Sequence, residues 1–284
     1  MATFRIADTF FECPGFLYHS ATALEFFRSS GKPDVILRLC DQMFSREIDH
    51  QTLAFSAAPV WELYRIETGW IINIPSASAQ KSSIGVRVLF DKDFREGDLY
   101  FNRFATDAPE IQGSMIAFVI KLVMIHLLNH GRGVLLHACG LSHNGQGILF
   151  VGVSGAGKTT TANLWRKQSG VTLLSDDRVV VRKREDGRFW IYGTPWYGDA
   201  KAASPEAVPL ERVFILRHGN ENCVLKIPSV VAVEQLFRCA SPAFWNPTGV
   251  DFTLRFLESM VQELPTFRYD FLPDPSAVEY IQRL

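Results

Sequence analysis

The sequence lacks the features of disulfide-rich, zinc-binding or nucleic-acid-binding proteins. Its five cysteines are odd in number, far apart and never spaced as C-x-x-C, which argues against a disulfide framework and a zinc knuckle. The chain carries 29 Lys and Arg against 30 Asp and Glu, a net charge of −1, so no basic surface would gather nucleic acid. We therefore predict a protein of a reducing cytoplasm with no nucleic-acid partner.

The sequence also lacks a long apolar run, and we expect no signal peptide. The start MATFRIADTF has no charged segment followed by an apolar one. The most apolar run, residues 115–128, contains Lys121 and His126 and is shorter than the roughly 20 residues that a bilayer requires. We predict a buried helix there and no membrane partner.

Residues 1–110 read mostly as strands and predict a smaller β-rich N-terminal domain with a possible role in substrate or partner recognition. The expected strands are short, rich in Val, Ile, Phe, Tyr and Trp, and separated by turn residues. They read FRIADTFFEC, DVILRLC, TLAFS, VWELYRIE, GWIINIP, SIGVRVLF and LYFNRF. The polar stretch ATDAPE, residues 105–110, predicts the junction to the second domain.

Residues 111–284 alternate between strand and helix patterns and predict an α/β domain with a mixed sheet. Two strands, GVLLHACGLS and GILFVG, flank Asn144-Gly145, which favours a tight hairpin turn. A second hairpin is expected at Asp186-Gly187. Further strands are expected in VTLLSDD, LERVFIL, CVLKIP and TFRYDF, with helices in SVVAVEQLFRCA, DFTLRFLESMVQEL and PSAVEYIQRL.

The strongest motif is a phosphate-binding loop between a predicted strand and a predicted helix. Residues 152–159, GVSGAGKT, match G-x-x-x-x-G-K-[ST] in full. The glycines let backbone N–H groups converge on a phosphate, and the N-terminus of the following helix adds its positive dipole end. Lys158 would meet the β and γ phosphates, and the Thr159 hydroxyl would bind Mg²⁺. The predicted nucleotide-binding residues are Gly152, Ser154, Gly155, Ala156, Gly157, Lys158, Thr159 and Thr160.

Two carboxylates follow the loop at the end of the next strand. Phosphoryl transfer needs a metal clamp on the phosphates and a base that accepts the proton of the attacking hydroxyl. Asp176 and Asp177 suit both tasks, and because adjacent strand residues point to opposite faces, we expect them to divide these roles. A structural cap of the strand end is the alternative.

His137 lies in the strand that the hairpin places beside the loop strand, where it could orient or share the proton of an Asp. A half-buried histidine bonded to backbone is the structural alternative. Alternation of His137, Cys139 and His143 could also suggest a metal site, but the sequence shows no fourth ligand.

The loop GTPWYGDAK, residues 193–201, is a candidate substrate-contact segment, because functional residues often lie on loops. Trp196 and Tyr197 could stack on a base or a side chain, Asp199 could reach a metal, and Lys201 could meet phosphate. An aromatic-capped surface loop is the alternative. Arg268 could neutralise transition-state charge or form an ordinary ion pair.

The ordered combination HACGLSHNGQGILFVGVSGAGKTT followed by LLSDDRVVV resembles the HPr kinase/phosphorylase family and, more widely, the core of phosphoenolpyruvate carboxykinases. The resemblance covers residues 134–181. It implies an α/β P-loop core of that type, with ATP and Mg²⁺ as cofactors. It further implies phosphate contact by Lys158, metal contact by Thr159 and by Asp176 or its water shell, and proton transfer by Asp177 paired with His137.

The same resemblance implies phosphorylation of a serine hydroxyl on a protein, a peptide or a small molecule. HPr kinases have Lys-Ser where this loop has Lys158-Thr159, and their E-I-R-G signature has no counterpart here, so we expect an acceptor other than HPr. HPr kinases assemble as oligomers, which leaves a homo-oligomer open. The competing hypotheses are a nucleotide-gated binding module with little turnover and a carboxykinase-like lyase.

Overall fold

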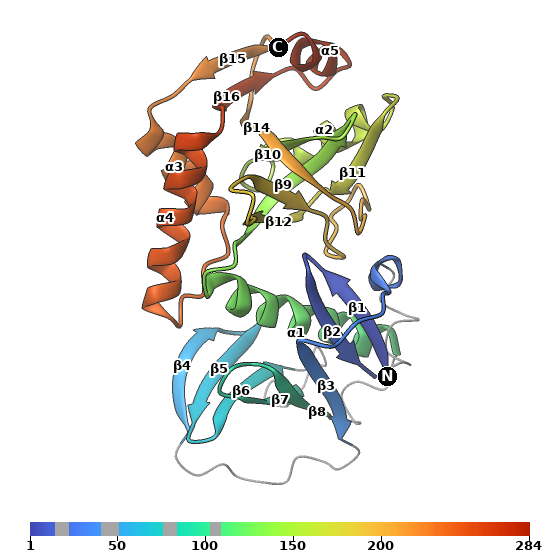
Figure 1. Cartoon of the computed structure of the whole chain (residues 1–284), viewed down its shortest axis with the longest axis vertical. Helices are drawn as coiled ribbons and strands as arrows, with labels where there is room; N and C mark the ends of the chain where they lie inside the picture. The colour runs from blue at the N-terminus through green and yellow to red at the C-terminus, as the bar shows by residue number, and fades with distance from the viewer. Residues whose placement is uncertain (15–22, 41–50, 76–83, 103–108) are drawn as a thin grey trace. The chain divides into compact units, whose positions relative to one another are not determined.

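The computed structural model divides into two compact units, Met1–His126 and Leu127–Leu284. Helix α1, Pro109–Asn129, crosses this division, and the boundary that we predict at residue 110 stays a prediction. Part of the expected junction 105–110 lies outside the described residues. The structure describes residues 1–14, 23–40, 51–75, 84–102 and 109–284, drawn in colour in Figure 1.

The first unit is built on one eight-stranded sheet with the order β1-β2-β3-β8-β7-β6-β5-β4. The pairs β2–β3 and β3–β8 are parallel, and the other neighbours in this order run antiparallel. A short 3-10 helix, Leu24–Phe27, lies between β2 and β3. The strands are β1 Ala2–Ile6, β2 Thr9–Cys13, β3 Val35–Cys40, β4 Thr52–Ala57, β5 Trp61–Ile66, β6 Gly69–Pro75, β7 Ile84–Asp91 and β8 Glu96–Phe101.

The segment FRIADTFFEC forms a hairpin, whereas the sequence predicted a single strand. Its turn residues Ala7 and Asp8 have φ values of 45° and 61°, and strands β1 and β2 pair antiparallel on either side. Two consecutive positive φ values are typical of the tight turns whose twist matches that of a hairpin. Because neither residue is Gly or Asn, the sequence pattern did not indicate this turn.

The second unit combines strands and helices at the positions that the sequence predicts. The Asn144-Gly145 pair adopts φ values of 51° and 82°, which confirms the predicted hairpin turn. Asn246 caps helix α4 by accepting a hydrogen bond from Thr248 N at 3.2 Å. The elements are β9 Val134–His143, β10 Gln146–Val151, α2 Lys158–Trp165, β11 Val171–Ser175, β12 Arg178–Lys183, β13 Phe189–Tyr192, β14 Ala207–His218, β15 Cys223–Lys226, α3 Ser229–Cys239, α4 Pro247–Glu263, β16 Thr266–Phe271 and α5 Ser276–Gln282.

The pairing of these strands overturns the predicted fold class. Strands β9, β12, β13, β14 and β10 pair in a closed ring, because β10 bonds to β9 on one side and to β14 on the other. Strand residues outnumber helical residues in the part of the chain that the structure describes, so the structure is mostly β. The predicted α/β class with a P-loop core of HPr kinase or phosphoenolpyruvate carboxykinase type is therefore wrong. Local patterns identified the strands but not the long-range pairings that close a five-stranded barrel.

Helices cover both faces of the strands in the second unit (Figure 1). Even-numbered side chains of β9, such as Leu136, pack in one buried cluster with Leu236 of α3 and Leu257 of α4. Odd-numbered ones, such as Leu141, pack in another with Trp165 of α2 and residues of α5. This alternation is the strand period of two.

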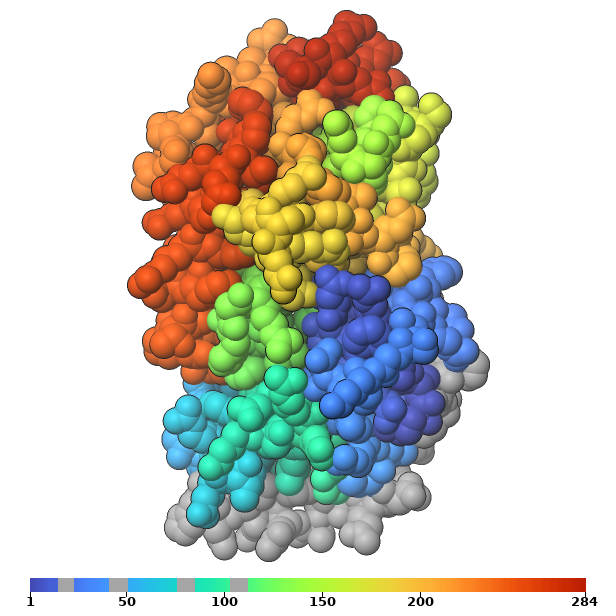
Figure 2. Space-filling model, in the orientation of Figure 1, coloured from blue at the N-terminus to red at the C-terminus, as the bar shows by residue number. Residues whose placement is uncertain are grey.

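The outer surfaces of α3 and α4, orange to red-orange in Figure 2, carry pairs of opposite charge one turn apart. Arg238 pairs with Glu234 at 2.7 Å on α3, and Arg255 pairs with Asp251 at 2.8 Å on α4. These helices are therefore amphipathic, with apolar inner faces and charged outer faces. Within the described ranges, no helix combines the length and apolar character needed to cross a membrane.

Candidate functional site

The loop after β10 has the geometry of a compact strand-to-helix turn. Strand β10 ends at Val151, and α2 begins at Lys158 with Gly157 as its N-cap in a left-handed conformation, φ 104°. Gly155 is also left-handed, with φ 80°. The N–H of Ala156 donates to the carbonyl of Val153 at 3.1 Å, which closes the loop on itself.

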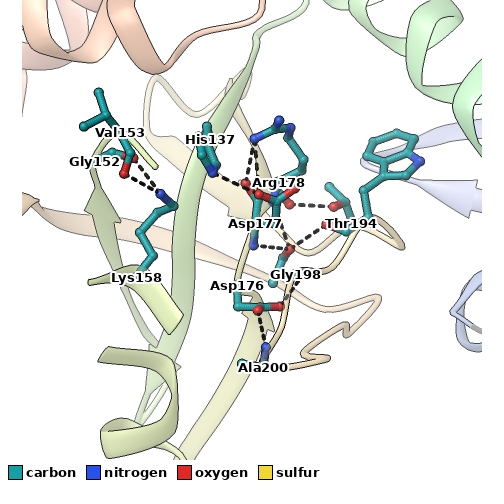
Figure 3. A network of polar contacts seen from close by, with 12 residues as sticks. His137, Gly152, Val153, Lys158, Asp176, Asp177, Arg178, Thr194, Gly198 and Ala200 are labelled. Carbon is teal, nitrogen blue, oxygen red and sulfur yellow. Dashed lines mark hydrogen bonds and ion pairs between the residues drawn. The ribbon is translucent and has the colours of Figure 1, made fainter. Parts of the chain in front are cut away.

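Lys158 is folded back onto this loop (Figure 3). Its Nζ donates to the carbonyl oxygens of Gly152 at 2.7 Å and Val153 at 3.0 Å. The residue is only 7% exposed, and this burial lowers the pKa of the ammonium group. The two carbonyls thus hold the ammonium group of Lys158 at the base of the loop.

Asp177 and His137 form a half-buried pair because of the strand register. Strands β9 and β12 place His137 opposite Arg178, the residue after Asp177. The His137 Nε2 atom lies 3.0 Å from Asp177 Oδ1, and Arg178 Nη1 lies 3.4 Å from the same oxygen. The carboxylate therefore has an imidazole and a guanidinium as neighbours, drawn in Figure 3.

Asp176 has different hydrogen-bond partners from Asp177, and it is only 2% exposed. Its Oδ1 accepts the N–H groups of Gly198 at 3.0 Å and Ala202 at 3.1 Å, and its Oδ2 accepts that of Ala200 at 2.8 Å. One carboxylate thus accepts hydrogen bonds from three backbone amides of the segment 198–202; Figure 3 labels two of these residues, Gly198 and Ala200. The side chains of Asp176 and Asp177 point to opposite sides, as expected for neighbouring residues at a strand end.

A cavity of about 480 Å³ joins these groups. It is lined by all of the predicted site residues except Gly152 and Ala156. The structure adds Gly198, Asp199 and His218 to this lining. Asp199 is exposed and belongs to the segment that Asp176 holds, so the candidate loop 193–201 contributes to the cavity through two of its residues.

His218 is the lining residue that the sequence did not indicate. It ends β14, which pairs parallel to β10, and its Nε2 lies 2.9 Å from the carbonyl oxygen of Gly155. The two residues are 63 positions apart in the chain. The histidine at the end of the LERVFIL strand could have indicated this contact, but only if the parallel pairing of β14 with β10 had been known.

The remaining candidates are not among the residues that line the cavity. Trp196 is 8% exposed, Lys201 is exposed, and Arg268 pairs with Asp270 at 3.0 Å. Cys139 is fully buried, and burial raises the pKa of its thiol to about 12, which disfavours the thiolate that a metal would need. The part of the chain that the structure describes contains no group of three or more His, Cys, Asp or Glu that could hold a metal ion.

Comparison with known proteins identifies one family. No curated protein matches the chain. Residues 106–254 match the family model described as SynChlorMet cassette protein ScmC. That description names no activity, so the resemblance of residues 134–181 to HPr kinases stays a prediction. Because the matched residues amount to more than half of the chain, the protein belongs to the ScmC family of SynChlorMet cassette proteins.

Proposed function

We propose that this protein is an ATP- and Mg²⁺-dependent phosphotransferase that transfers the γ-phosphoryl group to a hydroxyl, most simply that of serine, on a protein, a peptide or a small molecule. One observation carries the proposal. The loop that matches the phosphate-binding motif and the His137–Asp177 pair line the same cavity. A nucleotide site beside a carboxylate and imidazole pair suits transfer better than binding alone, because binding requires no base.

The residues present fit a bound nucleoside triphosphate. The cavity of about 480 Å³ lies within the usual range of small-molecule sites, about 300–1,000 Å³. Apart from the two chain neighbours, no described residue would lie within 4 Å of a Cβ added at Gly155, so the loop leaves open space there. Lys158 would bind the phosphates together with the N-terminus of α2. ATP would supply the transferable phosphoryl group, and Mg²⁺ would neutralise phosphate charge.

The protein offers few direct metal ligands, which suits Mg²⁺. This ion usually keeps several waters and binds one or two protein oxygens plus substrate phosphates. The Thr159 hydroxyl would be the direct ligand. Asp176 already accepts three backbone N–H groups, so we assign it contact with the metal only through the water shell.

Asp177 would act as the base that receives the proton of the acceptor hydroxyl. His137 would orient this carboxylate through the contact of 3.0 Å, with Nε2–H as the donor. Both side chains are partly exposed, 27% for His137 and 30% for Asp177, so an acceptor can reach them. We also propose a reducing, cytoplasmic location, since all five cysteines are free thiols.

The first test is incubation of purified protein with Mg²⁺ and γ-labelled ATP. The acceptor panel would contain serine, hydroxylated metabolites, HPr and serine-containing peptides, and mass spectrometry would locate the label. We expect Asp177→Asn to reduce transfer by about 10²-fold or more with nearly unchanged ATP affinity, the usual magnitude for a general base. Asp251→Asn, on the outer face of α4, is the matched control and should transfer at the wild-type rate. Full transfer by Asp177→Asn would exclude it as the base.

A nucleotide-gated binding module is the second candidate, and the position of Lys158 favours it. The ammonium group bonds to two carbonyls of its own loop and would have to leave them to meet phosphate. Such an exchange of partners can couple nucleotide binding to a change of loop conformation. Tight ATP binding without labelling of any acceptor would support this module over the phosphotransferase.

A further inference from the structure

We propose that His218 is a positioning residue that fixes the Gly155–Ala156 peptide of the phosphate loop before a nucleotide arrives. This inference rests on the proposed nucleotide site and adds a residue to it that the loop motif does not contain. His218 lies at the end of β14, outside the segment 152–159 that matches the motif. It lines the same cavity as Lys158 and Thr159.

The contact between His218 and the loop has one chemically consistent form. The Nε2 atom of His218 lies 2.9 Å from the carbonyl oxygen of Gly155. A carbonyl oxygen only accepts hydrogen bonds, so Nε2 must carry the proton and donate it. The imidazole therefore occupies a lone pair of this carbonyl.

Gly155 has no side chain that could restrain its backbone. It is exposed and has a left-handed φ of 80°. Apart from its two chain neighbours, no described residue has an atom within 4 Å of the position that a Cβ would occupy, so side-chain packing does not hold Gly155 there. A glycine in open space populates many backbone conformations. The bond from His218 selects one of them.

The imidazole is itself held in place by the strands beneath the loop. Parallel pairing of β14 with β16 places His218 opposite Phe271, and the two rings stack with centroids 5.5 Å apart and an interplanar angle of 27°. Phe271 is 1% exposed. The same Phe271 ring lies against Gly157, where an added Cβ would meet its Cζ at 2.3 Å. Phe271 and His218 thus form a fixed support for the loop.

This support fixes one peptide unit at both of its ends. The carbonyl of Gly155 accepts from His218, and the N–H of Ala156 in the same peptide donates to the carbonyl of Val153. The peptide cannot flip without losing both bonds. Fixing a loop in advance strengthens binding, because the ligand then does not have to order it. Without His218, the negative end of the Gly155 carbonyl dipole would also be free to turn toward an anion.

Two substitutions separate the hydrogen bond from the ring. His218→Phe keeps an aromatic ring to stack on Phe271 but removes the donor, and His218→Gln keeps an N–H donor at a similar reach but removes the ring. Isothermal titration of each variant with ADP and with inorganic pyrophosphate would measure affinity. We expect His218→Phe to lower the affinity for both anions by the same factor, about 3- to 10-fold, which is the effect of losing one hydrogen bond. The affinity of His218→Gln for each anion should stay within about twofold of the wild-type affinity, a smaller change than the loss of one hydrogen bond would cause.

Amide hydrogen exchange of the ligand-free protein provides a readout that needs no nucleotide. We expect a peptide that contains residues 153–157 to exchange faster in His218→Phe than in His218→Gln or the wild type. Equal exchange and equal affinities in His218→Phe and the wild type would overturn the role of His218, and so would a His218→Gln variant as impaired as His218→Phe. Failure of the wild type to bind either anion would instead overturn the proposed nucleotide site, while the exchange data would still decide whether His218 holds the loop.

Discussion

Asp176 and Asp177 are neighbours in the chain but have different surroundings. Asp176 is 2% exposed and accepts three backbone N–H groups, whereas the Asp177 side chain is 30% exposed and contacts His137 and Arg178. A buried carboxylate that satisfies several amides fixes the segment that carries them. At this position the protein therefore depends on the charge and shape of Asp176 for its structure.

The same substitution at these two residues should separate stability from chemistry. In Asp176→Asn the new NH2 group faces backbone N–H donors, so at least one buried donor loses its acceptor. We expect a loss of about 1–3 kcal/mol in the free energy of unfolding, measured by denaturant titration. Asp177→Asn, the matched control, should lose about 1 kcal/mol or less, because its side chain contacts solvent. Equal stabilities of the two variants would contradict the anchoring role of Asp176.

The turn from β10 to α2 contains two left-handed glycines in very different surroundings. An added Cβ at Gly157 would lie 2.3 Å from Cζ of Phe271, a ring that is 1% exposed and packs in the core. An added Cβ at Gly155 would meet none of the described residues within 4 Å, apart from its two chain neighbours. The first position thus needs glycine for both backbone and space, and the second for backbone alone.

Alanine at each glycine should reveal this difference. We expect Gly155→Ala to lower the free energy of unfolding by about 1–2 kcal/mol, the strain of a left-handed alanine. Gly157→Ala should cost about 1–3 kcal/mol more, because the methyl group overpacks the core beneath the loop. Thermal or urea unfolding followed by circular dichroism would measure both losses. A Gly157→Ala variant no less stable than Gly155→Ala would show that the Phe271 ring can shift to make room for the methyl group.

Elements that depend on local pattern could be predicted from the sequence, and those that depend on pairing could not. The hairpin at Asn144-Gly145 and the strand-loop-helix around Lys158 follow from residue types a few positions apart. The parallel pair of β10 with β14 joins residues such as Val151 and Ile215, and no short-range pattern encodes it. That pairing closes the barrel and brings His218 to Gly155. The fold class and this site residue were therefore missed for the same reason.

The two units of the whole chain differ in what they contribute to the cavity. The described residues that line it, from His137 to His218, all belong to the unit Leu127–Leu284. A core substitution in the unit Met1–His126 should therefore lower stability without changing the geometry of the cavity. Leu37 of β3 and Leu149 of β10 are a matched pair for this test, since both are 0% exposed.

Leu37→Ala and Leu149→Ala should each lower the stability of their own unit by about 2–5 kcal/mol, since each leaves a cavity in a packed core. Titration with ADP below the first unfolding transition should give wild-type affinity for Leu37→Ala. Leu149 lies two residues before the end of the strand that carries the phosphate loop, so Leu149→Ala should bind ADP more weakly. A tenfold loss of ADP affinity in Leu37→Ala would mean that the N-terminal unit shapes the nucleotide site, and that the described cavity is only part of it.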